Sequence, residues 1–227
     1  MLNIQKEIRS HTDKEKALGS MRFFKTAKGQ YGAGDIFLGL TVPLTRSIVK
    51  KYITMERKDV LQLLSSKYHE ERLAALFILI AQYEKTKDRT IISDYLAKVQ
   101  HVNNWDLVDT SAYKLLGVYL RDTVKDEVKI LKVLKKLARS KNMWEQRIAI
   151  VSTFAFMQKG EGKYTYIIAD MLLGHTHDLL HKAVGWMLRE AGKKVSELEL
   201  IKYLNANEKK MSRTAWRYAR ERLGRDM

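Results

Sequence analysis

The chain has 227 residues, with 42 lysines and arginines against 26 acidic residues, a formal net charge of +16 and 45% hydrophobic residues. This composition allows a hydrophobic core and favours a polyanionic partner, nucleic acid first and an anionic membrane surface second. The sequence contains no cysteine, which excludes disulfides, thiolate metal sites and cysteine nucleophiles. It has neither a secretory signal nor an apolar run near the roughly 18 residues of a membrane span, so we expect a cytoplasmic protein without membrane attachment.

The first distinctive stretch is glycine-rich and covers Lys28–Gly39. It matches neither a nucleotide-binding phosphate loop nor the glycine fingerprint of a dinucleotide fold. We interpret it as a flexible loop, with backbone contacts to phosphate as the alternative. Beyond it, hydrophobic periodicity predicts helices over residues 69–85, 103–120, 124–140, 142–158, 164–173, 178–192, 195–204 and 211–224.

A weak internal repeat places a basic residue before small and apolar residues in four of these helices. The basic positions are Arg72, Arg147, Lys182 and Arg213, and their spacing indicates steps of about 35 to 40 residues. Such steps are typical of HEAT-like helical hairpins that stack into a curved α-solenoid. We therefore expect an all-α, single-domain protein over residues 1–227, with the basic positions on a concave face. An irregular helical bundle is the alternative.

The helix over 103–120 has an unusually polar start, NNWDLVD. Asn104 is suited to cap it, and Asp106 lies in the first turn, where a carboxylate favours the helix dipole. At about 100° per residue, Trp105, Asp109 and Leu116 fall together at one edge of the buried stripe. That stripe is predicted to contain Val108, Ser111, Leu115, Val118 and Tyr119. Asp109 has no capping role. Its position is explained either by a buried structural hydrogen bond or by a functional role.

Two later helices supply further candidates, Arg147 and Trp186. Indole faces attract cations by about 0.5–2 kcal/mol each, and a carboxylate stabilises developing positive charge. Two indoles, a carboxylate and a guanidinium would therefore suit a cationic group next to a phosphate. Taken singly, Arg147 is explained by an interhelical salt bridge and Trp186 by core packing.

The C-terminal stretch from Lys209 to Arg225 is strongly basic, and Arg213, Arg217 and Arg220 share one helix face. A solvated face and a phosphate-binding face both explain this pattern. His177 and His181 have a spacing that is common among metal ligands, but further ligands are not evident. We therefore expect neither a metal nor another cofactor.

Four segments, in this order and spacing, resemble the AlkD-like family of DNA alkylation repair glycosylases, which are built from HEAT-like repeats. They are FLGLTVPLTRSIVKKY (Phe37–Tyr52), NNWDLVD (Asn103–Asp109), WEQRIAIV (Trp144–Val151) and KAVGWMLREAG (Lys182–Gly192). The resemblance covers roughly Met21 to Arg222. It implies excision of positively charged N3- and N7-alkylated purines, such as 3-methyladenine and 7-methylguanine, from double-stranded DNA, without the full base flipping of most glycosylases.

The resemblance also implies roles for individual residues. Asp109 takes the position of the catalytic residue, and Trp105 and Trp186 take those of the lesion contacts. Arg147 takes the position of the family's phosphate-side arginine, and Arg189 that of a further basic residue. We add Lys182, Arg213 and Arg217 as candidate contacts to the DNA backbone.

Two other functions stay open. One is a non-catalytic HEAT-repeat protein that binds DNA structures, which the presence of Asp109 and both tryptophans disfavours. The other is a HEAT-type protein scaffold, which predicts weak DNA binding that salt hardly changes. For a true DNA-binding protein, log affinity falls against log salt by about 0.9 per phosphate neutralised. We expect a monomer that is associated with the nucleoid when bound to DNA.

Overall fold

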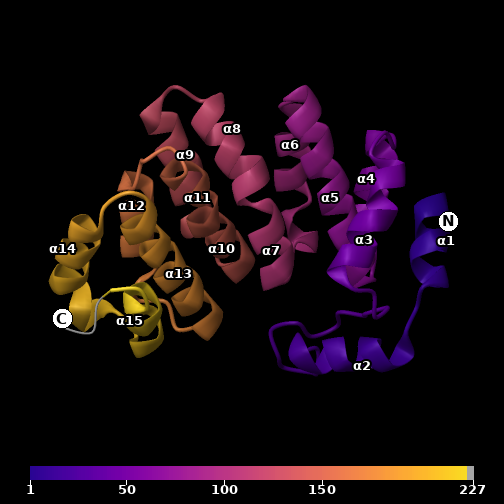
Figure 1. The fold of residues 1–227 in the computed structure, drawn as a ribbon, viewed down its shortest axis with the longest axis horizontal. Coiled ribbons are helices and arrows are strands. Elements are labelled where there is room, and N and C mark those ends of the chain that lie inside the picture. The colour runs from indigo at the N-terminus through magenta and orange to yellow at the C-terminus, as the bar shows by residue number, and fades with distance from the viewer. Residues whose placement is uncertain (224–227) are drawn as a thin grey trace. The chain divides into compact units, whose positions relative to one another are not determined.

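The computed structural model describes residues 1–223, which are helical apart from turns and one isolated bridge between Ile36 and Tyr68 (Figure 1). The chain forms two compact units, unit 1 over Met1–Ser111 and unit 2 from Ala112 onward. Gly224 and Arg225, the ends of the predicted last helix and of the basic stretch, lie outside the described residues. Within residues 1–223, no helix combines the length and the apolar character that crossing a bilayer requires.

Unit 1 contains seven α-helices and two short 3₁₀ turns. They are α1 (Asn3–Ser10), α2 (Lys14–Phe23), α3 (Val42–Val49), η1 (Lys50–Tyr52), α4 (Arg57–Leu64), α5 (His69–Thr86), α6 (Thr90–Ala97), η2 (Val99–His101) and α7 (Trp105–Ser111). The described part of unit 2 begins with a π-helical turn. Its elements are η3 (Tyr113–Gly117), α8 (Val118–Asp122), α9 (Glu127–Ala138), α10 (Met143–Ser152), α11 (Phe154–Met157), α12 (Lys163–Leu172), α13 (Asp178–Lys194), α14 (Glu197–Asn207), η4 (Glu208–Lys210) and α15 (Arg213–Arg220).

The helices recur with a regular step along the chain. The second helices of successive pairs, α5, α7, α10, α13 and α15, begin at residues 69, 105, 143, 178 and 213, which are 35 to 38 residues apart. This spacing is that of helical-hairpin repeats and confirms the predicted all-α repeat fold. The curved solenoid, its basic concave face and the single domain stay predictions.

Helix α5 is the central helix of unit 1 and contacts α1, α3, α4 and α7. Its segment Leu73–Ile80 is buried on every side, so this part of the helix has no solvent-facing stripe. The charged first turn is buried with it, and its four residues each expose at most 3% of their surface. Each of these groups needs a partner, because an unpaired buried charge is costly. The four residues are His69, Glu70, Glu71 and Arg72.

The glycine-rich loop provides partners for this turn. Its second half is anchored by these contacts, which differs from the flexible loop that the sequence predicts. The Glu70 carboxylate accepts the backbone N–H groups of Leu38 and Gly39 at 2.8–3.0 Å. Gly39 has a φ of +88°, and a Cβ at this position would collide with the carbonyl oxygen of Asp13. The loop therefore closes over the start of α5 and brings Asp35 against it.

The predicted continuous helix over 103–120 contains a π-helical turn at η3. The extra residue of a π turn rotates everything that follows it around the helix axis. Val118 and Tyr119, predicted to be buried, are consequently part-exposed, while Leu116, predicted at the edge of the stripe, is fully buried. The prediction holds before the π turn, where Val108 and Ser111 are buried.

Helix α13 is the central helix of unit 2 and contacts α10, α11, α12, α14 and α15. Its close approach to α15 depends on Gly185, since a Cβ there would collide with the Ala215 carbonyl and the Tyr218 side chain. Trp186 follows directly, so this packing also determines where its indole emerges from the helix.

Candidate functional site

Helix α7 carries both residues that stand out in the NNWDLVD stretch. Trp105 is its first residue and Asp109 lies one turn later, so both side chains project from the same side of the helix. Both residues are part-exposed. The Asn104 side chain accepts the N–H of Trp105 at 2.9 Å, which confirms the predicted cap.

The Trp105 indole belongs to an aromatic stack that sequence reasoning missed. Phe24 stacks on Trp105 with ring centroids 5.3 Å apart, and Phe37 stacks on Phe24 at 4.9 Å. Phe23, which is 64% exposed, meets Trp105 edge-on at 6.0 Å. The only signal for this stack is the pair of adjacent phenylalanines just before the glycine-rich loop. The stack supports the Trp105 indole with packed aromatic rings. The exposed Phe23 ring lies beside the indole.

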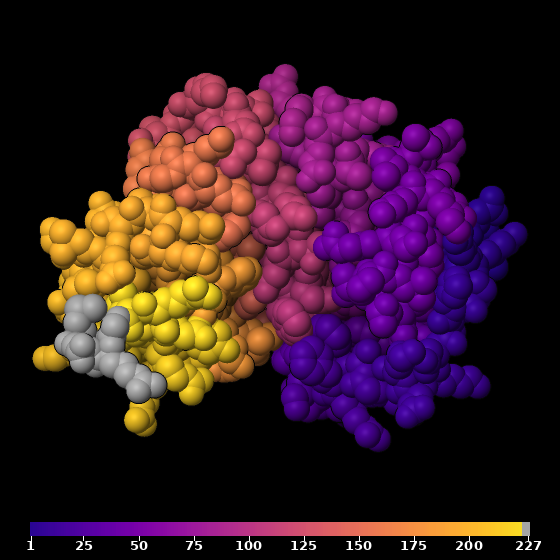
Figure 2. Space-filling model, viewed as in Figure 1, coloured from indigo at the N-terminus to yellow at the C-terminus, as the bar shows by residue number. Residues whose placement is uncertain are grey.

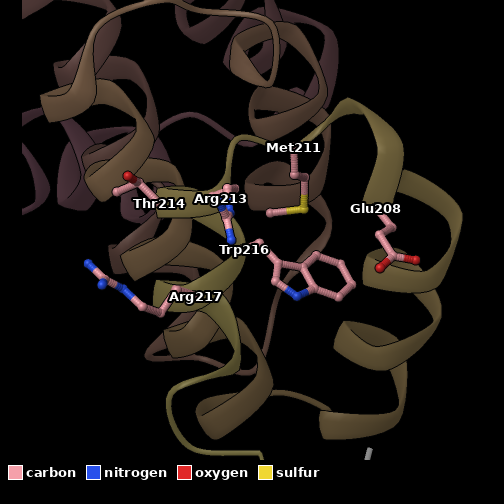
Figure 3. A pocket seen from close by; sticks show the side chains of 6 residues that line it. All are labelled: Glu208, Met211, Arg213, Thr214, Trp216 and Arg217. Carbon is pink, nitrogen blue, oxygen red and sulfur yellow. The ribbon is translucent and has the colours of Figure 1, made fainter.

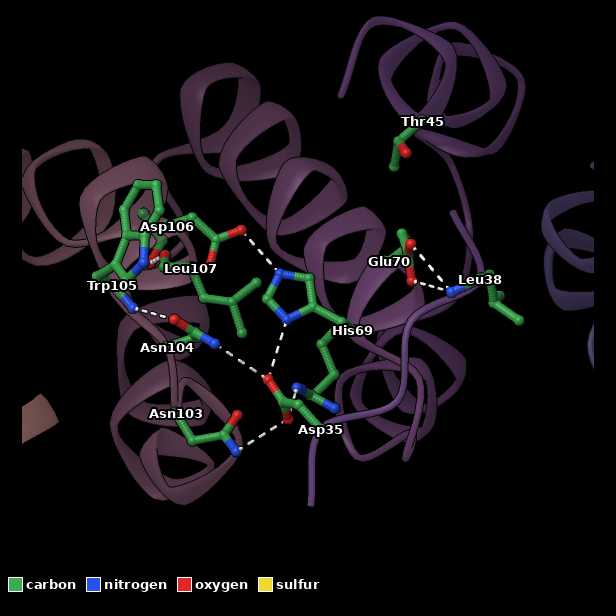
Figure 4. Close-up of polar contacts among 12 residues, drawn as sticks. Asp35, Leu38, Thr45, His69, Glu70, Asn103, Asn104, Trp105, Asp106 and Leu107 are labelled. Carbon is green, nitrogen blue, oxygen red and sulfur yellow. Dashed lines mark hydrogen bonds and ion pairs between the residues drawn. The ribbon is translucent and has the colours of Figure 1, made fainter. Parts of the chain in front are cut away.

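A buried polar network lies beneath this stack and is centred on His69 (Figure 4). The His69 ring is held between two carboxylates: its Nε2 lies 2.7 Å from Asp106 Oδ2 and its Nδ1 lies 3.2 Å from Asp35 Oδ2. Arg72 pairs with the other oxygen of Asp35 at 2.6 Å. The network therefore joins the glycine-rich loop, α5 and α7 at one point.

Asp35 collects further donors from the segment that leads into α7. Asn103 and Asn104 donate to its carboxylate at 3.3 and 3.2 Å. Burial raises the pKa of Asp35, but the hydrogen bond from His69 and the charge of Arg72 outweigh it, so the pKa lies below the usual value. Burial lowers the pKa of His69, but the charge and hydrogen bond of Asp106, with that of Asp35, raise it to about 9. His69 is therefore an imidazolium at neutral pH.

Two interpretations of individual residues change in consequence. The sequence explains Asp106 by its effect on the helix dipole alone, but in the structure it is the ion-pair partner of His69. The repeat pattern predicts Arg72 on the basic concave face, but it is 3% exposed and bound to Asp35. The glycine-rich loop covers the start of α5, so Arg72 and His69 are buried there, and His69 takes Asp106 of α7 as a partner.

Trp186 is part-exposed and lies on α13 in unit 2. Its indole is 6.5 Å from the ring of Phe154, which Tyr113 meets edge-on at 5.3 Å. The Lys194 ammonium lies 5.3 Å from the centre of the same Phe154 ring. Unit 2 therefore presents its own part-exposed indole with aromatic support.

The basic candidates of unit 2 lie on three helices, of which α13 contacts both others. Arg147 on α10 is 5% exposed and donates to the carbonyl of Leu179 at the start of α13. Lys182 pairs with Asp178 at 2.8 Å, one turn earlier on α13. Arg189 pairs with Glu221 and lies 3.9 Å from Glu190. Phosphate contacts by these residues stay predictions.

Helix α15 lies on the surface of unit 2 (Figure 2). It borders a hollow of about 590 Å³ (Figure 3). Arg213 and Arg217 are exposed, and the Arg217 side chain extends away from Trp216 in Figure 3. The Arg220 guanidinium lies over the Trp216 ring at 5.4 Å. The hollow is lined by Glu208, Met211, Arg213, Thr214, Trp216 and Arg217.

The histidines of the segment HTHDLLH (His175–His181), which include His177 and His181, have structural contacts. The Nδ1 atom of His177 accepts the N–H of Leu179, so this residue caps α13, and the Nδ1 atom of His175 accepts the N–H of His177. Burial lowers the pKa of His175 and of His177. Among residues 1–223, the structure contains no group of three or more His, Cys, Asp or Glu side chains arranged to hold a metal.

Comparisons with known proteins give one family match and one similar fold. The profile of the family described as DNA alkylation repair enzyme matches residues 4–223. The fold is similar to a solved structure described as a predicted DNA alkylation repair enzyme from Enterococcus faecalis, with a TM-score of 0.73 and 16% identity, over 94% of this chain and 97% of that one. No curated protein matches the chain. The chain belongs to the DNA alkylation repair enzyme family.

Proposed function

We propose that this protein is a monofunctional DNA glycosylase that hydrolyses the N-glycosidic bond of cationic N3- and N7-alkylated purines in duplex DNA. Its substrates would include 3-methyladenine and 7-methylguanine. We further propose that it acts as a cytoplasmic monomer, associated with the nucleoid when bound to DNA, and that it needs no cofactor. Membership of the DNA alkylation repair enzyme family supports the repair role.

One observation carries the proposal: a part-exposed indole and a part-exposed carboxylate project from the same side of α7, one turn apart. An indole face attracts a cationic ring, and a carboxylate stabilises a sugar that becomes positively charged. Trp105 and Asp109 therefore match the two charged species of this reaction. The aromatic stack on Trp105 holds its indole in this orientation.

The chemistry needs no proton donor for the leaving group. An N7- or N3-alkylated purine already carries a positive charge, so the glycosidic bond breaks with its electron pair moving to the base, which leaves neutral. The oxygen of a water molecule then bonds to C1′ of the sugar and one proton is released. In this scheme Asp109 stabilises the oxocarbenium-like sugar and orients the water.

Unit 2 would add the second indole and the contacts to the DNA backbone. We propose that Trp186 touches the lesion and that basic side chains bind phosphates. The net charge of +16 supports a polyanionic partner. The proposed phosphate contacts are Arg147, Lys182, Arg189, Arg213 and Arg217.

The charge of the lesion is the sharpest test of this function. Duplexes of one sequence would carry 7-methylguanine, the neutral lesion hypoxanthine or guanine at the same position. We expect 7-methylguanine to be released faster than hypoxanthine, by up to about 30-fold from one indole alone, since an indole contributes up to about 2 kcal/mol to holding a cation. Free base would be quantified by chromatography, with an enzyme-free reaction subtracted.

Equal release of the cationic and the neutral lesion would contradict recognition of charge. If no base is released but the protein binds DNA with a steep dependence on salt, the alternative holds, and the protein is a non-catalytic HEAT-repeat protein that binds DNA structures. Weak binding that salt hardly changes would instead favour a protein scaffold.

A further inference from the structure

The His69 network contains two positive and two negative groups, all held within one region of unit 1. The positive groups are His69 and Arg72 and the negative ones are Asp35 and Asp106. Asp35 comes from the loop, Arg72 from the same helix as His69, and Asp106 from α7. Loss of the His69 proton would leave two carboxylates facing one guanidinium, so the network depends on the imidazolium.

The imidazolium is connected to Trp105 by two separate routes. Through polar contacts, Asp106 and Asn104 tie the start of α7 to His69 and to Asp35. Through ring contacts, His69 stacks on Phe37 with centroids 4.3 Å apart, and Phe37 stacks on Phe24, which in turn stacks on Trp105. The backbone and the indole of Trp105 are thus both supported by one buried ring.

The position of this ring also bears on Asp109. Asp106 and Asp109 belong to the same short helix, so a shift at the Asp106 end displaces the carboxylate one turn later. His69 itself is 2% exposed, and Phe37 and Phe24 separate it from Trp105. It therefore affects the surface only through the residues that it holds.

We propose that His69, as an imidazolium clamped between Asp35 and Asp106, is a positioning residue that presents Trp105 and Asp109 for base excision. The proposal deepens the proposed function and rests on it for its effect on activity. Its structural part, the control of the Trp105 indole by His69, is independent of any reaction. Deprotonation of His69 removes one of its two N–H donors, which weakens the polar tie between α5 and α7 and loosens the aromatic stack.

The test uses the full-length protein labelled with 5-fluorotryptophan and followed by fluorine NMR. The Trp105→Phe variant assigns the Trp105 signal. We expect this signal to shift as the pH rises, with a midpoint at about 9, because the supporting imidazolium loses its proton there. In His69→Gln the shift with pH disappears, and the signal stays away from its wild-type position at neutral pH.

Glu71→Gln is the matched control. Glu71 lies on the same helix, is fully buried and binds Gln5 and Arg9, so it holds α1 rather than α7. In the Glu71→Gln variant we expect the Trp105 signal to shift with pH as it does in the wild type. Asp106→Asn is the second variant, and it keeps the shape of the side chain while removing its charge. It should lower the midpoint, because the charge of Asp106 favours the imidazolium.

Activity supplies the second measurement. Single-turnover release of 7-methylguanine should fall by about tenfold or more in His69→Gln at neutral pH, with DNA affinity nearly unchanged, because small misplacements of catalytic groups are costly. A wild-type Trp105 signal that does not titrate near the midpoint, or a His69→Gln signal at the wild-type position, would overturn the positioning role. If wild type releases no base but its Trp105 signal titrates as expected, the proposed function fails and control of Trp105 by His69 stands.

Discussion

Replacing Asp109 with asparagine is expected to slow the release of 7-methylguanine by about 100- to 1000-fold, the range typical for losing one electrostatic contact to a transition state. The amide keeps the size of the side chain but removes the negative charge that stabilises the developing positive sugar. Affinity for unmodified duplex should stay near the wild-type value, since Asp109 contributes no attraction to phosphate. Single-turnover assays measure the rate and fluorescence anisotropy measures the affinity.

Asp59→Asn provides the control, because it makes the same change in net charge at the start of α4. We expect its rate of base release to match the wild type. Thermal unfolding of both variants would verify that each remains folded. Wild-type release by Asp109→Asn, or an equal loss in the Asp59→Asn control, would remove Asp109 from the mechanism.

Replacing Asp35 with alanine is expected to destabilise unit 1 by about 3–5 kcal/mol, the cost of breaking a buried ion pair and leaving its partners uncompensated. Asp35 is 4% exposed and binds Arg72, His69 and two asparagine side chains. Hydrogen exchange of the α5 and α7 backbone amides reports the free energy of opening in this unit directly.

Asp13→Ala is the matched comparison, since Asp13 caps α2 from a part-exposed position by accepting the N–H of Lys16. It should cost only about 1 kcal/mol, the usual contribution of an N-cap. If Asp35→Ala lowered the stability of unit 1 by no more than Asp13→Ala does, the network would contribute little to that stability.

The stability of unit 1 should also depend on pH in two windows. The pKa of His69 is raised from 6.5 to about 9, so its contribution is complete below pH 6.5 and disappears as the pH rises through about 9. The pKa of Asp35 is lowered from 3.8, so its contribution is complete above that value and disappears as the pH falls through the depressed pKa. Maximum stability is therefore expected between these windows.

The sequence was sufficient to predict the helical repeat because its hydrophobic periodicity and its spacing are both local. The start of α7 was predicted for the same reason, since Asn104 caps the helix that begins at Trp105. The π turn at η3 was not predicted, because it adds a residue to one helical turn without a recognisable motif. Val118 and Tyr119 were misplaced as a result.

The His69 network escaped prediction for a different reason. Its members come from a loop, from α5 and from α7, and no periodicity relates Asp35 to a histidine 34 residues later. A usable signal was nonetheless present. The HEER sequence immediately precedes a run too apolar to leave a polar face, so those charges had to be buried and paired. The sequence thus indicates that these charged residues need partners, but it does not identify the partner residues.

The most direct measurement exposes methylated genomic DNA to the wild-type protein and identifies what leaves the DNA by mass spectrometry. We expect free 7-methylguanine and 3-methyladenine in solution, with one abasic site left in the DNA for each base released. Methylated bases that are restored in place, without abasic sites, would show repair by direct reversal and contradict a glycosylase. Release of unmodified purines at the same rate would contradict recognition of a cationic lesion.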